Sequence, residues 1–422
     1  MSAGCREKLC AGNRPRLRLY NGATVKTTEH KAIFTMTSPR PALRPPVVVI
    51  APDSFKGSLS AEDVARAIGA GIRAAIPDAE IRLRPIADGG EGTLDALMHA
   101  GGERFAIACR NAAGQMTEAP VGILKDGSAV VESAAIVGLT DAAGTAVAVE
   151  RRSTLGVGDA IKALLDRGAR SFLVALGGSS TNDGGAGLLA ALGVVFYDAA
   201  GTEVAPAPAE LHRVVRVDAS GLDARVKEAH FVAMSDVDNP LCGAEGATAV
   251  FGPQKGVQPD QVAPLDQTLA HFAQVLEEAL GRQAATLPGA GAAGGLGYAL
   301  LMLGAQFRSG AQTVADHIGL DQALTGADWL ITGEGRSDAQ TLHGKAPFIA
   351  SQRARQLGVP TTLLSGGIDR QSLAQLQTSF SGCFSIVFGP GSLQDAIAQA
   401  PQLLQASAEQ LARLWQNAAA MR

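Results

Sequence analysis

One order of segments recurs along this chain: a short apolar run, then a polar loop rich in glycine, and then a stretch with helical periodicity. Short runs of Val, Ile and Leu are typical of strands that are buried on both faces of a parallel sheet. The order therefore predicts an α/β fold with mainly parallel sheets, which bind ligands beyond the carboxyl ends of their strands. The predicted strands are Val47–Ala51, Ile81–Ile86, Ser171–Leu176, Phe231–Met234, Trp329–Thr332 and Thr361–Leu364.

Three other stretches depart from this order. Short alternating segments with Gly and Asp turns between Glu103 and Ser133 predict an antiparallel ribbon. Apolar residues at helical spacing predict long amphipathic helices over Gln258–Leu280 and Leu393–Leu414. Ser60 stands where an N-cap is expected, ahead of a helix with Val64, Ile68 and Ile72 on one side.

Composition and charge exclude several classes of protein. The 422 residues are enough for two or three domains, and a hydrophobic content of 46% excludes global disorder. No apolar run is long enough to span a membrane, which takes about 18 residues. Residues 1–45 carry a net charge of +7 and the rest −11, and an acidic body with few aromatic residues is a poor nucleic-acid binder. Five scattered cysteines fit neither a disulfide framework nor a zinc site, so we expect a reducing, cytoplasmic location.

The first 45 residues show no hydrophobic core of a secretory signal and no helical period. We expect them to be a disordered basic tail. Two explanations of this tail stay open at this stage: an organelle transit peptide, or an upstream start codon with Met36 as the working start.

Common nucleotide-binding motifs are absent or out of place. Gly289, Gly291 and Gly294 have the spacing of a dinucleotide fingerprint, but no convincing strand precedes them, which excludes a nicotinamide-dependent dehydrogenase of this type. No P-loop and no nucleophile elbow occur. The turn Gly289–Gly295 opens the apolar helix predicted over Leu296–Leu303, and it serves either to bind an anion through backbone amides or to allow tight helix packing.

Several loops after the predicted strands combine glycine, carboxylates and cations. They are Asp88-Gly89-Gly90-Glu91, Asn182-Asp183-Gly184-Gly185, Gly252–Gly256 with Lys255, and Gly333–Asp338. Phosphoryl transfer needs this mixture, because amides and cations neutralise phosphate oxygens while carboxylates hold Mg²⁺ or take a proton. A single Asp-Gly turn is ordinary, but the repetition of such loops at strand ends predicts an anionic ligand.

These stretches resemble the signature segments of the type I glycerate kinase family. The resemblance rests on Ile50–Ser60, Asp88–Thr93, Gly177–Gly185, Asp236–Leu241, Phe251–Gly256, Pro288–Gly297 and Ile331–Lys345, and it runs from Val47 nearly to the C-terminus. It implies an ATP-dependent, Mg²⁺-requiring kinase that phosphorylates D-glycerate, mostly to 2-phosphoglycerate, on a two-domain α/β fold unrelated to P-loop kinases.

We assign roles on this basis. Lys56 or Arg336 would hold the substrate carboxylate, and Asn239 would lie near the phosphates. The candidate catalytic residues are Asp183, Lys56, Asp338 and Glu334. The candidate substrate-binding residues are Asp53, Ser54, Lys56, Arg336 and Lys345. The candidate nucleotide- and phosphate-binding residues are Gly177, Gly178, Ser179, Thr181, Asn182, Gly184, Gly185, Lys255, Gly291 and Gly294. The candidate metal ligands are Asp88, Glu91 and Asp236.

The resemblance also implies that one domain is built from both ends of the chain. We place it at residues 46–88 and 289–422, with a second α/β domain inserted at 89–288 and the active cleft between the two. Transfer to the 3-hydroxyl of glycerate and a non-catalytic sensor of a hydroxy acid or nucleotide stay open as alternatives. Small molecules are the expected partners, and the sequence leaves an oligomer open.

Overall fold

The computed structural model describes residues 44–420, and the predicted basic tail lies almost entirely outside this range. The fold is α/β with mainly parallel sheets, as predicted. Its strands are β1 (Val47–Ile50), β2 (Glu80–Leu83), β3 (Gly102–Arg110), β4 (Met116–Leu124), β5 (Ala129–Glu132), β6 (Ser171–Ala175), β7 (Val195–Tyr197), β8 (Arg216–Asp218), β9 (His230–Met234), β10 (Gln306–Arg308), β11 (Trp329–Thr332), β12 (Arg336–Ser337), β13 (Thr361–Ser365), β14 (Gly367–Ile368) and β15 (Gly382–Ser385).

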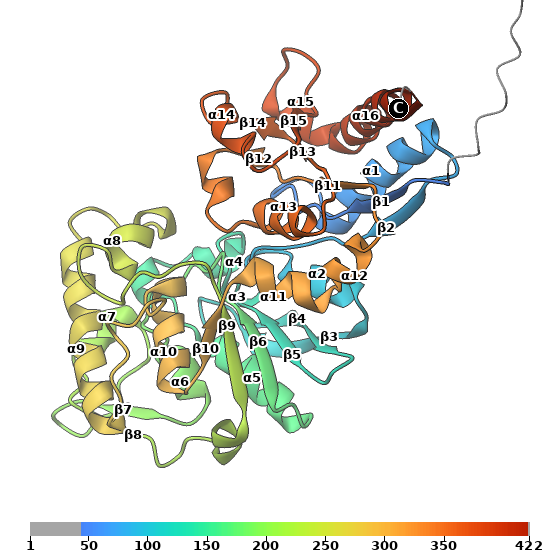
Figure 1. Ribbon diagram of the computed structural model, residues 1–422. Helices are drawn as coiled ribbons and strands as arrows, with labels where there is room; N and C mark the ends of the chain where they lie inside the picture. The colour runs from blue at the N-terminus through green and yellow to red at the C-terminus, as the bar shows by residue number, and fades with distance from the viewer. Residues whose placement is uncertain (1–43, 421–422) are drawn as a thin grey trace, which may run out of the picture. The chain divides into compact units, whose positions relative to one another are not determined.

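Helices separate most of these strands (Figure 1). The α-helices are α1 (Ala61–Ala75), α2 (Thr93–His99), α3 (Ser133–Val137), α4 (Ala142–Thr145), α5 (Leu155–Asp166), α6 (Ala186–Ala191), α7 (Pro208–Leu211), α8 (Ala247–Phe251), α9 (Val262–Leu280), α10 (Leu296–Met302), α11 (Gly310–His317), α12 (Leu320–Leu324), α13 (Ala346–Gln356), α14 (Leu373–Leu376), α15 (Leu393–Ala398) and α16 (Ala400–Ala420). The 3₁₀ turns are η1 (Val149–Arg151), η2 (Ala224–Glu228), η3 (Pro253–Lys255), η4 (Ala292–Gly295) and η5 (Ala339–Leu342).

The strands form two main sheets. One has five strands in the order β15-β13-β11-β1-β2, and every neighbouring pair is parallel. The other has six strands in the order β10-β9-β6-β5-β4-β3, in which β10, β9, β6 and β5 are parallel. Antiparallel pairing of β3 with β4 and of β4 with β5 confirms the ribbon predicted between Glu103 and Ser133.

Side chains of β1 alternate between two cores, as the period of a strand requires. Val48 and Ile50 pack with α1 and α16 on one face, where Ser60 caps α1 by accepting a hydrogen bond from the Asp63 amide. Figure 1 shows α1 and α16 side by side over this face of the sheet. Val49 and Ala51 pack on the other face into a core that includes α2, α11, α12 and α13.

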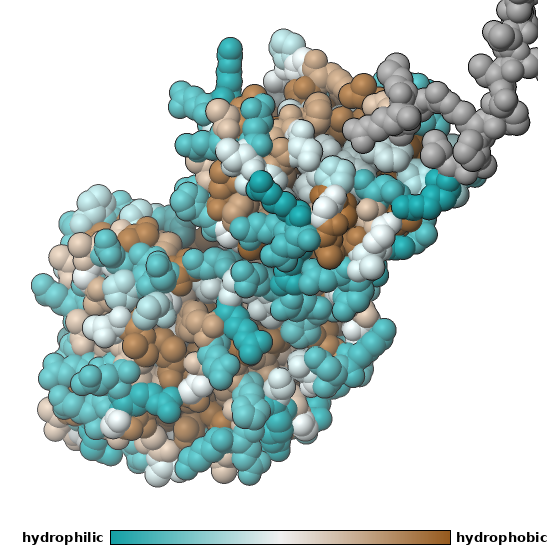
Figure 2. Space-filling view, in the orientation of Figure 1, coloured by the Kyte–Doolittle hydropathy of each residue, from teal (hydrophilic) through white to brown (hydrophobic). Residues whose placement is uncertain are grey.

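The core beneath Val49 also takes side chains from the six-stranded sheet. Val130 of β5, Leu173 of β6 and Met234 of β9 belong to it, so α2 and α11 pack between strands of both sheets. The opposite face of the six-stranded sheet, with Phe172 and Phe231, packs against α5, α6, α9 and α10. Polar residues cover most of the surface visible in Figure 2, and apolar residues appear there as separate patches.

The helix predicted over Leu393–Leu414 is two helices. α15 ends at Ala398, and α16 begins at Ala400, with Pro401 as its second residue. Proline has no backbone N–H and disfavours helical conformation in the residue before it, so a helix begins readily at Pro401 but does not run through it. The apolar periodicity of the sequence shows which face of a helix is buried, but it does not reveal where one helix ends and the next begins.

Sheet membership bears on the proposed division into domains. The five-stranded sheet takes strands from both ends of the described chain, and the six-stranded sheet takes strands from between them. β10 pairs with β9, so a division that follows the sheets would cross after Arg308 and not at Gly289. The boundaries themselves stay a prediction. No helix within residues 44–420 is long and apolar enough to cross a membrane.

We expect Leu404→Ala to lower the free energy of unfolding by about 2 to 5 kcal/mol, because Leu404 of α16 is fully buried in the core that α16 shares with α1 and β1. Trp329 and Trp415, the two tryptophans of the chain, stack in the same core at 5.9 Å between ring centroids, so their fluorescence in a urea titration reports on this region. Leu414→Ala is the control, because Leu414 is 64% exposed. Equal losses in the two variants would contradict the packing described here.

Candidate functional site

Asp53 lies in the loop after β1, beside the loop after β11. The amide of Asp53 donates to the Gly333 carbonyl at 2.8 Å, which continues the pairing of the two strands beyond their ends. The side chain is 3% exposed, and its Oδ1 accepts a hydrogen bond from the Ser54 amide. Burial, then the charge of Asp88, raises the pKa of Asp53 well above its ordinary value, although Lys56 acts in the opposite direction.

Lys56 pairs with Asp88 across the ends of β1 and β2. Its Nζ lies 3.6 Å from Asp88 Oδ2, and the lysine side chain is half-exposed. Partial burial alone would lower the pKa of Lys56, but Asp88, Asp53 and Glu334 outweigh it and raise the pKa. Lys56 is therefore a charged ammonium at neutral pH and faces several carboxylates.

Asp236, in the loop after β9, belongs to the same group. Desolvation and the charge of Asp88 together raise the pKa of Asp236 to about 6, against hydrogen bonds from Ser309 and the Gly310 amide that lower it. A Cβ built on Gly344, the residue before Lys345, would lie 3.8 Å from the carboxylate carbon of Asp236. The loops after β2, β9 and β11 therefore meet at Asp236.

Glu334 uses both of its carboxylate oxygens within the protein. Oε1 accepts hydrogen bonds from Thr341 Oγ1 at 2.6 Å and from Ser337 Oγ at 3.1 Å. Oε2 accepts from Lys345 Nζ at 3.2 Å, which makes a nearly buried ion pair. Glu334 thus fixes the loop from Gly333 to Lys345.

Three other predicted residues lie at the edge of this group. Asp338 caps the 3₁₀ turn η5, where its Oδ1 accepts from the Gln340 amide. Arg336 is exposed on β12, and its charge contributes to a lowered pKa of Asp369, which comes mainly from a hydrogen bond donated by Ser372. Glu91 is exposed and lines the cavity beside Lys56.

The glycine-rich loop after β6 presses against the loop after β2. The Gly177 amide donates to the Gly89 carbonyl at 3.0 Å, and a Cβ on Gly177 would lie 2.6 Å from the Gly90 Cα. Since real Cβ atoms do not approach backbone so closely, this crossing requires glycine at position 177.

The turn that contains Gly291 and Gly294 packs on the same loop from the other side. The Gly184 amide donates to the Gly294 carbonyl at 3.0 Å, and a Cβ on Gly294 would lie 2.0 Å from the Thr181 carbonyl oxygen. A Cβ on Gly185 would meet the Ala299 Cβ at 2.3 Å, and one on Gly178 would meet the Ala134 Cβ at 3.0 Å. Of the two interpretations of this turn, the described contacts support close packing.

Lys255, the last residue of η3, is buried and binds the Gly177–Gly185 loop. Its Nζ donates to the Thr181 carbonyl at 2.7 Å and to Ser179 Oγ at 3.3 Å. Burial lowers the pKa of Lys255 to about 7, with Asp183 acting against that shift and Arg152 adding to it. The adjacent Thr181 Oγ1 and Asn182 Oδ1 are buried and have no hydrogen-bond partner among the described residues, although Asn182 Nδ2 donates to Thr248.

Asp183 is fully buried, and protein donors take up its oxygens. Oδ2 accepts from the Thr154 amide at 2.7 Å, from Thr154 Oγ1 at 2.8 Å and from the Gly187 amide at 3.1 Å, and Oδ1 accepts from the Gly185 amide at 3.0 Å. Burial raises the pKa of Asp183 against these bonds. These contacts anchor the Gly177–Gly185 loop at Asp183.

Sequence reasoning missed two buried charged residues. Glu132, 5% exposed at the end of β5, accepts hydrogen bonds from the Gly92 amide at 3.1 Å and the Leu94 amide at 2.9 Å. Arg152 donates to the carbonyls of Lys255 and Ser180. The one signal for Glu132 was a charged residue placed directly after the apolar run Ala129–Val131.

A cavity of about 440 Å³ opens beside Lys56. Its lining includes Ser54, Lys56, Glu91, Arg104 and Glu132. The Ser54 side chain is 8% exposed, and its Oγ has no hydrogen-bond partner within the described part of the chain. The lining carries two cations, Lys56 and Arg104, and three carboxylates, those of Glu91, Asp95 and Glu132.

The carboxylates fit a metal site in which the protein supplies only some of the ligands. Within residues 44–420, no three Asp, Glu, His or Cys side chains are grouped closely enough to hold an ion by themselves. Asp88 and Asp236 are close enough for one to raise the pKa of the other. Mg²⁺ at kinase sites is held by one or two carboxylates together with phosphates and water, so this pair fits the ion and Glu91 is not needed.

Comparison with known proteins gives the family. The glycerate kinase family matches residues 48–416. A glycerate kinase of Bacillus subtilis is 42% identical over 86% of this chain and 96% of its own length. A glycerate 2-kinase of Escherichia coli is 40% identical over 83% of this chain and 92% of its own length. The crystal structure of a Salmonella typhimurium LT2 protein assigned as glycerate kinase 2 superposes with a TM-score of 0.78 at 37% identity, over 89% of this chain and 99% of that one.

The two sheets and the loops at their strand ends therefore define a kinase, and the chain belongs to the glycerate kinase family. This confirms the resemblance seen in the sequence.

The buried Lys255 makes stability depend on pH. Its pKa falls from 10.5 to about 7 on folding, so between these values the unfolded chain holds a proton that the folded chain has lost. The free energy of unfolding attributable to Lys255 should therefore rise from about pH 7 to about pH 10 and stay low below pH 7, where both states are protonated.

Urea unfolding of wild type and Lys255→Met at about pH 7 and about pH 9 tests this. We expect wild type to gain stability relative to the variant at the higher pH. Lys227→Met, at an exposed lysine, should show no such difference. Parallel pH curves for wild type and Lys255→Met would show that Lys255 stays charged when the protein folds.

Proposed function

We propose that this kinase transfers a phosphoryl group from ATP to the 2-hydroxyl of D-glycerate and forms 2-phosphoglycerate. The observation that carries the proposal is the meeting of Asp53, Lys56, Asp88 and Asp236 at the carboxyl ends of β1, β2 and β9, in a chain of the glycerate kinase family. The printed name of the Escherichia coli relative, glycerate 2-kinase, supports the 2-position. Transfer to the 3-hydroxyl stays the alternative.

Glycerate would bind in the cavity that Ser54 and Lys56 line. Its carboxylate needs a cation, and Lys56 keeps its charge because the neighbouring acids raise its pKa. The hydroxyl of Ser54, which has no partner in the described structure, can bond to a substrate oxygen. Arg336 is the second candidate for the carboxylate.

Nucleotide phosphates would lie against the loop Gly177–Gly185, whose backbone carries few side chains. Asp88 and Asp236 would hold Mg²⁺, which when bound neutralises charge on the phosphoryl oxygens. Neutralisation by a cation would also stabilise these two carboxylates, since they repel each other.

Asp53 is the proposed acceptor of the hydroxyl proton. Glu334 is engaged at both oxygens by Thr341, Ser337 and Lys345, and Asp183 is engaged by five backbone and side-chain donors. The structure gives Asp53 one hydrogen bond, from the Ser54 amide. Its raised pKa makes it a stronger base than an ordinary aspartate.

A direct assay tests the reaction. Purified protein with ATP and Mg²⁺ should release ADP when D-glycerate is added, and phosphorus NMR should show 2-phosphoglycerate as the product. A 3-phosphoglycerate signal would favour the alternative position. Binding of glycerate without any glycerate-dependent ADP release would favour a sensor and sink the proposed reaction.

The role of Lys56 can be tested by substitution. Lys56→Ala removes the cation that is proposed to hold and orient glycerate by its carboxylate, and we expect kcat to fall about 100- to 1,000-fold. The free energy of unfolding should change by less than about 1 kcal/mol, because Lys56 is half-exposed and its ion pair is at the surface. Lys227→Ala is the matched control and should keep wild-type kcat; near-normal turnover in Lys56→Ala would remove Lys56 from the site.

A further inference from the structure

The end of β5 lies next to both loops that carry the proposed phosphate and metal sites. β5 pairs in parallel with β6, and Glu132 stands opposite Ala175 in this register. Because parallel strands end at the same edge, the residues that follow them are neighbours. Glu132 and Ser133 therefore emerge beside Gly177, which itself contacts Gly89 and Gly90.

Glu132 is fixed to the loop after β2 by two hydrogen bonds, one on each oxygen. Oε1 accepts from the Gly92 amide and Oε2 from the Leu94 amide, across about 40 residues of sequence. Gly92 has a positive φ of 87° and stands just before α2, so its amide and that of Leu94 have no acceptor within the helix. The carboxylate thereby holds the end of the segment that begins at Asp88.

The other end of this segment is held by its own contacts. The Gly90 amide donates to Asp88 Oδ1 at 3.1 Å, and the Gly89 carbonyl accepts from Gly177. Ser133, next to Glu132, donates from Oγ to the Gly177 carbonyl at 3.4 Å. Glu132 and Ser133 thus link the Asp88 loop and the Gly177 loop to one strand.

The charged groups around Glu132 are mixed. Glu91 and Asp95 raise its pKa, after burial, to about 7, while the bonds from Leu94 and Gly92 lower it. Lys56 and Arg104 line the same cavity, and Arg104 pairs with Asp95 at 2.9 Å. Burying a carboxylate at this position is unfavourable in itself. What the carboxylate contributes is the pair of hydrogen bonds that fixes the position of the Asp88 loop.

We propose that Glu132 is a positioning residue for phosphoryl transfer: by accepting the amides of Gly92 and Leu94 it holds the loop that places Asp88 against Lys56. The inference rests on the proposed function. A displacement of a reacting group by about 1 Å can cost about 100-fold in rate, so a loosened loop lowers kcat even though Glu132 does not itself hold the substrate.

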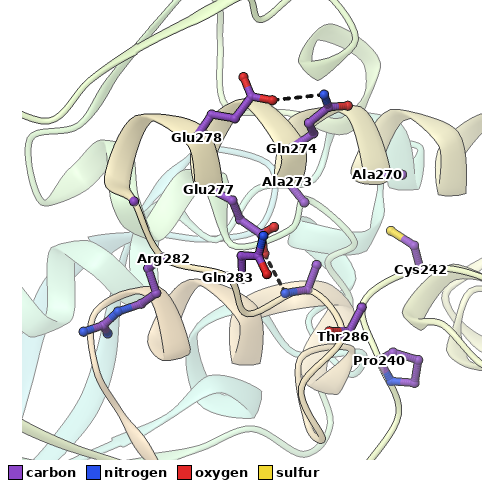
Figure 3. A pocket seen from close by; sticks show the side chains of 12 residues that line it. Pro240, Cys242, Ala270, Ala273, Gln274, Glu277, Glu278, Arg282, Gln283 and Thr286 are labelled. Carbon is purple, nitrogen blue, oxygen red and sulfur yellow. Dashed lines mark hydrogen bonds between the residues drawn. The ribbon is translucent and has the colours of Figure 1, made fainter.

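Glu132→Gln is the test substitution, because it keeps the shape and turns one of the two acceptor oxygens into an NH₂ donor. Glu277→Gln is a matched control. Glu277 Oε1 also accepts from two backbone amides, those of Ala284 and Ala285, each at 2.7 Å, but it lies in a different cavity of about 620 Å³ beside α9 (Figure 3).

Two measurements separate a positioning role from a structural one. In Glu132→Gln we expect kcat to fall about 10- to 100-fold and the Mg²⁺ concentration for half-maximal activity to rise. Hydrogen exchange of peptides from residues 88–99 should become faster. In Glu277→Gln, whose side-chain carbonyl oxygen can still accept both bonds, kcat and exchange of residues 88–99 should stay as in wild type.

Wild-type kcat in a folded Glu132→Gln, or equal losses of kcat in both variants, would overturn the inference. If Glu132→Gln does not fold, exchange in the wild-type protein decides: the amides of Gly92 and Leu94 should be more protected than that of Glu91, which has no acceptor among the described residues, and equal rates would contradict the proposed tether. Absence of glycerate-dependent ADP release in wild type would instead reject the proposed function, and exchange would still test the tether.

Discussion

The contact of Gly177 with Gly89 and Gly90 is the constraint on which the site depends. It is a crossing of two backbones, with a hydrogen bond of 3.0 Å and no room for a Cβ. One loop follows a strand of the five-stranded sheet and the other a strand of the six-stranded sheet, so the crossing ties together the loops of two separate sheets. Any side chain at position 177 would push these loops apart, and with them Asp88 and the proposed phosphate loop.

Charge is the second constraint. Asp88 and Glu334 raise the pKa of Asp53, Asp88 also raises that of Asp236, and Lys56 offsets only part of the effect on Asp53. Such an arrangement opposes folding by itself, because ionised carboxylates are costly when buried together. The proposed function explains why it persists, since a divalent cation and a phosphoryl group bring the opposite charges in the right places.

The sequence was sufficient for the strands and for the loops at their ends. Buried parallel strands must be apolar over their whole length, so Val47–Ile50 and Trp329–Thr332 are recognised from residue type alone. The sequence did not predict the hydrogen bonds that hold the loops in place. Glu132 bonds to Gly92, and Asp183 to Thr154, across long stretches of chain that no spacing of residues reveals.

Carboxylates that look alike in the sequence differ in how much of their hydrogen-bonding capacity the protein already uses. Asp183 and Glu334 are saturated by protein donors, so they fix loops and have little left for a ligand. Asp53 is buried with a single hydrogen-bond donor, and its raised pKa records that deficit, while Asp236 is exposed and open to a ligand. Groups that the fold leaves unsatisfied are the ones that gain most from a ligand, because buried polar atoms without partners are unfavourable. The same reasoning applies to Ser54 Oγ, and it supports the proposed site at the ends of β1, β2 and β9.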